Sequence, residues 1–134
     1  MSVQTLVQAA LKAALEAHAP LAGGVTAVFD APPVRAARPF AVVEEAILTD
    51  WGAKGAEGRE ARVAVALFDA GERPVRLRVL AGAAEEAIAA LPRALGEGWA
   101  VASLVLLRSR IAREGDGRWM ALSEFRVRML RTEL

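Results

Sequence analysis

The stretch DWGAKGAEGREARVAVALFD, residues 50–69, decides how the fold of this chain is interpreted, because its two halves follow different patterns. The first half spaces glycines three apart, at 52, 55 and 58. The second half alternates apolar residues with small or charged ones, as a half-buried β-strand does. The glycine-spaced half is therefore either a cradle for a phosphate group or the loop between two strands. The two faces of the strand would carry Val63, Val65 and Leu67 on one side and Arg62, Ala64, Ala66 and Phe68 on the other.

A phosphate cradle requires more than glycine spacing. A nucleotide-binding loop of the GxxxxGK[ST] type lies between a strand and a helix, whose N-terminal end helps to hold the phosphate. The chain has no GK[ST], and a strand rather than a helix follows residues 52–58. We therefore interpret residues 52–58 as the tip of a hairpin that joins two strands.

Two helices are predicted on either side of this region. Ser2 is a good N-cap, and apolar residues recur after it at helical spacing. Pro20 ends that pattern, so we expect the first helix to stop near His18. A second helix begins near Pro74 and runs to Leu91, with many small residues that allow close packing. The polar side of the first helix would consist of Gln4, Gln8, Lys12 and Glu16.

The remaining segments predict strands, and together the elements define the fold class. Glu44 and Glu45 interrupt the alternation of one strand, which we interpret as a β-bulge. A GDG turn at 115–117 predicts a hairpin near the end of the chain. The order α-β-β-β-α-β-β predicts an α+β fold in one domain, residues 1–134, with a single mainly antiparallel sheet of about five strands and two helices packed against it. The predicted strands are residues 25–30, 40–51, 59–69, 99–114 and 119–134.

Composition excludes several classes of function. The net charge is +1, from 17 basic and 16 acidic residues, which does not favour a dedicated polyanion binder. There are no cysteines, and His18 is the only histidine, so no metal site, cofactor or catalytic residue is predicted. No serine has a nucleophile motif, and no apolar run reaches the ~18 residues of a membrane span. We expect a soluble protein made inside the cell.

Arginines near the predicted C-terminal hairpin form the most distinctive polar set. Arg108, Arg110 and Arg113 precede the turn, while Arg126, Arg128 and Arg131 follow it, and across the hairpin we expect these six side chains to form a basic patch on one face of the sheet. Such a face is either a solvated surface balanced by nearby glutamates or a surface that contacts another subunit or nucleic acid.

The order of the segments resembles a known phage family. The matching features are VFDAPP at 28–33, PFAVV at 39–43, the DW–K–G–E segment with its strand, and WAVASLVLLRSRIARE at 99–114. They resemble the small tail-completion proteins of siphophage-type tails, which also occur in prophages and gene transfer agents. The resemblance covers about residues 1–130.

The resemblance implies a tail terminator and not an enzyme. Such proteins form a ring, typically hexameric, on the head-proximal end of the tail tube. The implied partners are copies of the chain itself, the tail tube protein and the head–tail connector, and DNA passes only transiently through the lumen. The resemblance also implies assembly in the bacterial cytoplasm and a final place at the head–tail junction of a virion or gene-transfer-agent particle.

Two other functions stay open at this point. A related tail protein, such as a tube subunit or head–tail adaptor, would have a similar pattern. A small enzyme or ligand-binding domain would instead show a concave pocket with converging polar groups. The candidate subunit or tube interface residues of a ring protein are Trp51, Lys54, Glu57, Arg59, Arg108, Arg110, Arg126 and Arg128.

Overall fold

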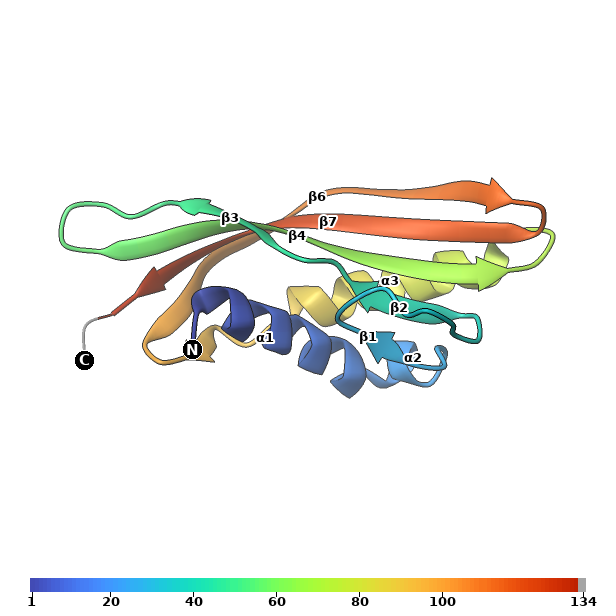
Figure 1. The fold of residues 1–134 in the computed structure, drawn as a ribbon, viewed down its shortest axis with the longest axis horizontal. Helices are drawn as coiled ribbons and strands as arrows, with labels where there is room; N and C mark the ends of the chain where they lie inside the picture. The colour runs from blue at the N-terminus through green and yellow to red at the C-terminus, as the bar shows by residue number, and fades with distance from the viewer. Residues whose placement is uncertain (133–134) are drawn as a thin grey trace.

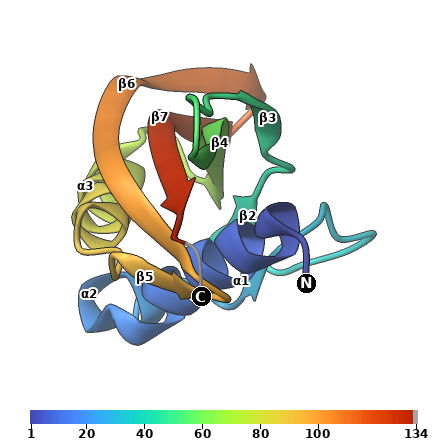
Figure 2. The ribbon, with the colours of Figure 1, turned by 90° about the vertical axis from the view of Figure 1, so that its left-hand side faces the viewer.

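Three long antiparallel strands form the centre of the fold in a computed structural model that describes residues 1–132. They are β4 (Glu57–Ala70), β7 (Arg118–Arg131) and β6 (Trp99–Gly115), and they run nearly the length of the molecule (Figure 1). The β6–β7 pair closes at the predicted GDG turn, where Gly117 has φ 64°. Viewed along its length, the sheet is strongly curled (Figure 2).

Four short strands complete the sheet: β1 (Val28–Phe29), β2 (Phe40–Val43), β3 (Ile47–Asp50) and β5 (Ala94–Gly96). The order across the sheet is β1-β2-β4-β7-β6-β5, and β3 pairs with β4 beside β2. The β1–β2 pair is parallel and the other pairs are antiparallel. Because β5 covers only the start of β6, the outer edge of β6 from residue 102 to 115 has no partner strand within residues 1–132.

The helices pack on one face of this sheet and leave the other face bare (Figures 1 and 2). They are α1 (Val3–Ala17), α2 (Ala19–Ala22) and α3 (Val75–Ala89). Buried residues alternate with more exposed ones along β7 and along most of β4, and this alternation decides which face the helices cover. The fully buried side chains of this core include Val63, Val65, Leu67, Phe125, Val127 and Met129 from the sheet and Leu11, Leu15, Leu77 and Ile88 from the helices.

The α+β class is confirmed, but the predicted number and order of elements are wrong. Within residues 1–132, seven strands and three helices replace the predicted five and two, and the parallel β1–β2 pair makes the sheet mixed. The unpredicted α2 forms because Pro20 lies in its first turn, where proline fits a helix, so this proline begins a helix after His18. The unpredicted β5 is too short to show an alternating pattern. The predicted last strand ends at Arg131, and residues 133–134 lie outside the described residues.

The strand predicted over residues 40–51 is divided in two, at the place where the bulge was predicted. Val43 pairs with Val65 and Ile47 with Arg62, so residues 44–46 lie opposite only two residues of β4. One residue is therefore extra, which is the count of a β-bulge. The strand predicted over 25–30 shortens to β1, which pairs in parallel because the proline-rich connection carries the chain back to the same end.

Gln8 of α1 supports this bulge, although the sequence predicts it on the polar side of the helix. Its side chain is buried, and its Oε1 accepts a hydrogen bond from the Ala46 backbone N–H at 2.9 Å. The bulge removes that N–H from the sheet ladder, so Gln8 supplies the missing acceptor. The predicted cap of the same helix is confirmed, since Ser2 Oγ accepts from the Thr5 N–H at 3.2 Å.

Replacing Gln8 with leucine should destabilise the fold, because it leaves the Ala46 N–H buried without an acceptor. We expect a loss of about 1–3 kcal/mol in the free energy of unfolding. Urea denaturation measures it, with Glu16→Leu at an exposed position of the same helix, away from the bulge, as the matched control. Equal stability of Gln8→Leu and the wild-type chain would contradict the role of Gln8 in holding the bulge.

Candidate functional site

The bare face of the sheet brings together four of the six arginines that the sequence predicts on one surface, whereas Arg113 and Arg131 lie on the opposite face. Residues paired across neighbouring strands share a face. Arg62 of β4 is opposite Arg126 of β7, and Arg126 is opposite Val105 of β6. In the same way the pairs Glu60–Arg128, Glu124–Arg108 and Leu122–Arg110 lie on this face. We call these rows the helix-free face, and the charged residues in the rows are Glu60, Arg62, Arg108, Arg110, Glu124, Arg126 and Arg128.

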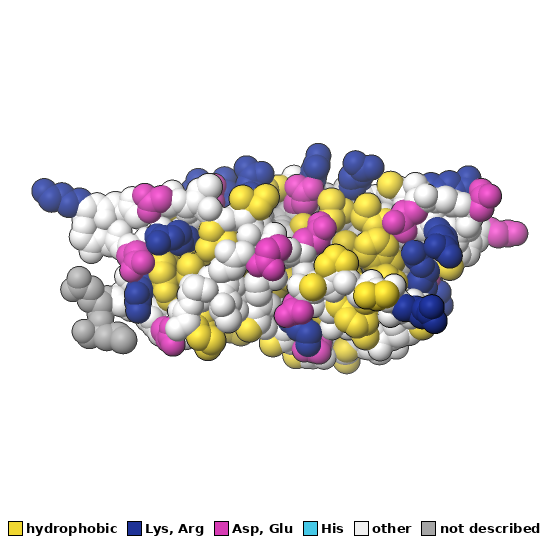
Figure 3. All heavy atoms as spheres, viewed as in Figure 1, with side chains coloured by type: hydrophobic (Ala, Val, Ile, Leu, Met, Phe, Trp, Pro, Cys, Tyr) yellow, Lys and Arg dark blue, Asp and Glu magenta, His cyan; other side chains and the backbone are white. Residues whose placement is uncertain are grey.

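The helix-free face keeps an excess of positive charge after its ion pairs are counted. Arg108 Nη2 lies 2.9 Å from Glu124 Oε1, and Arg128 Nε lies 2.9 Å from Glu60 Oε1. Five arginines and two glutamates leave an excess of three positive charges. Within residues 1–132, the other three arginines have no carboxylate within 4.0 Å. Figure 3 shows Lys and Arg side chains along the sheet side of the molecule and again at its right-hand end.

The glycine-spaced stretch 52–58 forms the end of the β3–β4 hairpin, which confirms the sequence interpretation. The Trp51 N–H donates to the Gly58 carbonyl at 3.1 Å, and Ala53 and Ala56 exchange two backbone hydrogen bonds at 3.0 and 2.9 Å. Gly55 has φ 82°, which glycine adopts without strain, at the turn beside Lys54. The hairpin projects at one end of the molecule (Figure 1).

Two of the predicted site residues meet although they are far apart in the sequence. The Arg128 guanidinium lies over the Trp51 ring, 5.3 Å from its centroid, while its Nε also contacts Glu60. Such a cation–π contact is worth about 0.5–1 kcal/mol at an exposed site. The hairpin base and the helix-free face are therefore continuous. Lys54 lies apart from them, exposed at the hairpin tip.

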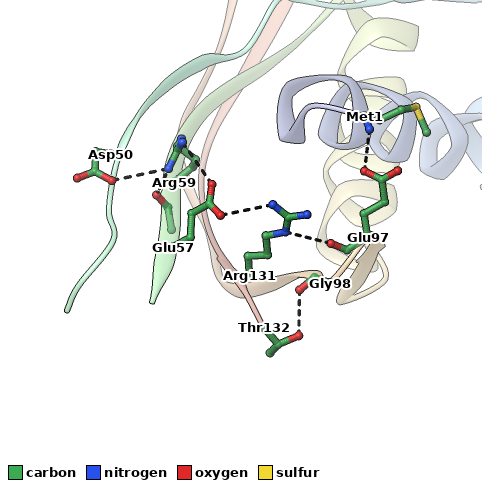
Figure 4. A network of polar contacts seen from close by, with 9 residues as sticks. Met1, Asp50, Glu57, Arg59, Glu97, Gly98, Arg131 and Thr132 are labelled. Carbon is green, nitrogen blue, oxygen red and sulfur yellow. Dashed lines mark hydrogen bonds and ion pairs between the residues drawn. The ribbon is translucent and has the colours of Figure 1, made fainter. Parts of the chain in front are cut away.

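Glu57 and Arg59 belong to a network that ties several chain segments together (Figure 4). Arg59 lies 3.7 Å from both Asp50 and Glu57, and Glu57 lies 3.5 Å from Arg131. Arg131 Nε donates to the Glu97 carbonyl at 3.3 Å, and the Met1 amino group lies 2.8 Å from the Glu97 carboxylate. Exposed pairs of this kind contribute little individually, so their main effect is to align the chain segments at this end of the sheet.

Asp69, whose side chain is buried, forms an ion pair with the half-exposed Arg76 that the sequence does not predict. Its side chain is 5% exposed, and both of its oxygens accept hydrogen bonds from Arg76 at the start of α3. The hydrogen bond from Arg76 holds the pKa of Asp69 below its usual value, although desolvation opposes this shift. The pair joins the end of β4 to α3, and no property of either residue alone would have revealed it.

Other surfaces offer little for chemistry. A groove of ≈ 570 Å³ between α1 and α3 is lined by alanine, leucine and proline, with His18 as the one ionisable lining residue. Residues 1–132 contain no group of three or more His, Asp or Glu side chains placed to hold a metal ion. None of the helices in the described part of the chain has the length and apolar character that crossing a membrane requires.

The fold and this surface define a class of virion structural proteins. The structure is similar to a chain from the virion of a native gene transfer agent particle, with a TM-score of 0.79 and 26% identity. The match covers 92% of this chain and 94% of that one. The profile of the family described as tail completion protein gp17 matches residues 7–130, and the chain belongs to that family. It is therefore a structural component of a phage-type tail. None of the curated proteins matches the chain.

Several residues of the surface were missed as site candidates. Glu60 and Arg62 lie on the helix-free face beside the four predicted arginines. Because they alternate with Ala61 and Val63 along the strand, the sequence alone could have placed them on the face away from the core. Ile47 and Val105 lie in the same row, but their exposure depends on which strands end the sheet, which only the structure shows.

Replacing Asp69 with asparagine should make the chain less stable at neutral pH and change how its stability depends on pH. A carboxylate with a lowered folded-state pKa stabilises the fold above its unfolded-state pKa, and this contribution is lost as the pH falls through the folded-state value. We expect a loss of about 1–2 kcal/mol at pH 7, where the pair is charged. The difference from wild type should narrow below about pH 4.

Thermal unfolding between pH 7 and pH 2 measures this effect. The control is Glu86→Gln, which removes an exposed carboxylate that has no ion pair within residues 1–132. A difference between Asp69→Asn and wild type that stays constant over the whole pH range would argue against the ion pair as its cause.

Proposed function

We propose that the protein is a tail terminator. It forms a closed, hexameric ring on the head-proximal end of the tail tube, stops further growth of the tube and joins it to the head-side connector. The ring assembles in the bacterial cytoplasm and then lies at the head–tail junction of the virion or gene-transfer-agent particle. The repeating subunit is the single domain of residues 1–134. Membership of the tail completion family over residues 7–130 is the observation that carries this proposal.

The shape of the subunit supports a ring. A closed ring of identical subunits needs two different, complementary surfaces on each copy. The curled sheet has two unlike edges, and the long strands give the molecule two unlike ends (Figure 1). The β3–β4 hairpin projects at one end and the β6–β7 turn lies at the other, which suits contact with the tube on one side and the connector on the other.

The charge of the helix-free face supports a position along the path of the DNA. DNA binds most tightly where many phosphates are neutralised, and tight binding would impede its passage. An excess of three positive charges on this face, within a chain of net charge +1, provides attraction without a dense basic patch. The arginines paired with glutamates are already partly neutralised, which lowers the attraction further.

Shortening the β3–β4 hairpin should impair termination while the subunit still folds. Replacing residues 53–56 with an Asn-Gly turn removes the tip that carries Lys54 but retains the β4 pairs from Gly58 onward. We expect tubes of irregular or excessive length with few attached heads. Electron microscopy of particles from the producing bacterium measures both properties.

Asp116→Asn, in the turn at the opposite end of the molecule, is the matched control for tube capping. Normal tail length and head attachment in the hairpin variant would reject the proposal that this hairpin contacts the tube. Incorporation of the wild-type chain along the whole tube would instead favour a tube subunit over a terminator.

A further inference from the structure

The outer edge of β6 is exposed in a way that isolated proteins avoid. Residues 102–115 have no partner strand within the described chain, and three consecutive apolar residues lie on this edge. Val105, Leu106 and Leu107 are 40%, 44% and 36% exposed. An open strand with apolar side chains is a template for pairing with another strand, and proteins normally cover or charge such edges.

The opposite edge of the sheet ends in β3 and has a matching character. Ile47 of β3 is 67% exposed, and it lies in one row with Arg62, Arg126 and Val105 across four strands. Both ends of this row are therefore exposed aliphatic side chains on the helix-free face. The two edges cannot meet within one molecule, since three strand spacings of ~5 Å separate them.

Charges beside these two edges are complementary. Glu44 and Glu45 lie at the bulge directly before β3, and within residues 1–132 neither forms an ion pair, although Glu45 accepts a hydrogen bond from Gln4. A cleft of ≈ 390 Å³ opens beside them, and Arg62 is the one basic residue among the three acidic ones, Glu44, Glu45 and Glu124, that line it. On β6, Arg110 forms no ion pair within the same residues and Arg108 has one partner.

The directions of the strands fit a contact between copies. β3, β4, β7 and β6 alternate in direction, so β3 and β6 of one molecule run in opposite directions. A second copy generated by rotation about an axis parallel to the strands has its strands in the same directions as the first. The β3 of that copy can therefore lie antiparallel to the β6 of the first. A repeated rotation of this kind closes a ring.

We propose that the β6 edge of one copy pairs antiparallel with the β3 edge of a second copy, with Ile47 opposite Val105. This inference rests on the proposed ring, and its occupant is another copy of this chain. In this register residues 47–49 of β3 lie opposite residues 105–103, inside the regular segment 103–106 between two register shifts of β6, and Asp50 lies opposite residue 102. In this register Glu44 and Glu45 lie toward Arg108 and Arg110 of the neighbour, which adds a charge match to the apolar one.

The chain has no cysteines, so an engineered disulfide reports this contact directly. A chain carrying both Ile47→Cys and Val105→Cys should, on oxidation, give a ladder of reducible covalent oligomers that stops at a closed ring. A disulfide needs Cβ atoms within ~4.5 Å, so the bond can only join two molecules. Gel electrophoresis and native mass spectrometry measure the products.

The matched control pairs Ile47→Cys with Leu106→Cys, one position along β6 and therefore on the other face of the sheet. We expect roughly tenfold less cross-linking than with Val105→Cys, because the Cβ atoms point apart. Equal cross-linking by the two pairs overturns the proposed register. The absence of covalent oligomers from the Ile47→Cys/Val105→Cys chain at high concentration overturns the edge pairing itself.

Charge reversal provides a second measurement on chains without cysteine. Glu44→Arg and Arg110→Glu should each weaken self-association, and the double variant should restore it, because both partners of the contact are then reversed. Lack of restoration overturns the charge match. If the Ile47→Cys/Val105→Cys chain forms normal rings but oxidation links no subunits in them, edge pairing is rejected and the terminator function is unaffected. If oxidation instead gives covalent oligomers that grow without closing, edge pairing is supported and the closed ring is contradicted.

Discussion

The pairing of β4 with β7 is the constraint on which the rest of the structure depends. The two strands pair over the whole of β4, from Glu57 with Arg131 to Ala70 with Arg118, without a register shift. Because side chains alternate along a strand, a slip of one residue would move the whole buried set to the opposite face. One register therefore decides where α1 and α3 pack, and by exclusion it decides which face keeps the arginines.

The other edge of β4, away from β7, is covered by the segment that precedes it in the chain. The segment from residue 40 to 50 is long enough to cover much of this edge, but one extra residue at the bulge separates β2 from β3. The Gln8 side chain replaces the hydrogen bond that the ladder loses there. A single buried amide on α1 thus couples the helix layer to the strand that ends the sheet, so the packing of the core and the position of an exposed edge are linked.

Local patterns predicted the parts of this fold that depend on local periodicity. The alternation in residues 59–69 predicted a central strand and the faces of its side chains, and the missing helix after residue 58 excluded a nucleotide loop. Contacts between distant segments were not predictable in this way. The Trp51–Arg128 contact and the Asp69–Arg76 pair depend on how distant segments pack. Pro20 was expected to end a helix, but it lies in the first turn of the short helix α2, where a proline is also compatible with helical geometry. Four of the six arginines predicted on one face lie there, while the exposed edges beside them were not predicted.

The separation of the two sheet faces has an evolutionary consequence. Stability resides mainly in the face under the helices, and substitutions away from a core usually change it little. Apart from the residues that contact neighbouring proteins, side chains of the bare face can therefore change while the scaffold persists, which fits a relative in a gene transfer agent virion that keeps the fold at 26% identity. Folding and contact with neighbouring proteins then depend largely on different residues. The same fold can therefore serve particles whose contact surfaces differ in charge.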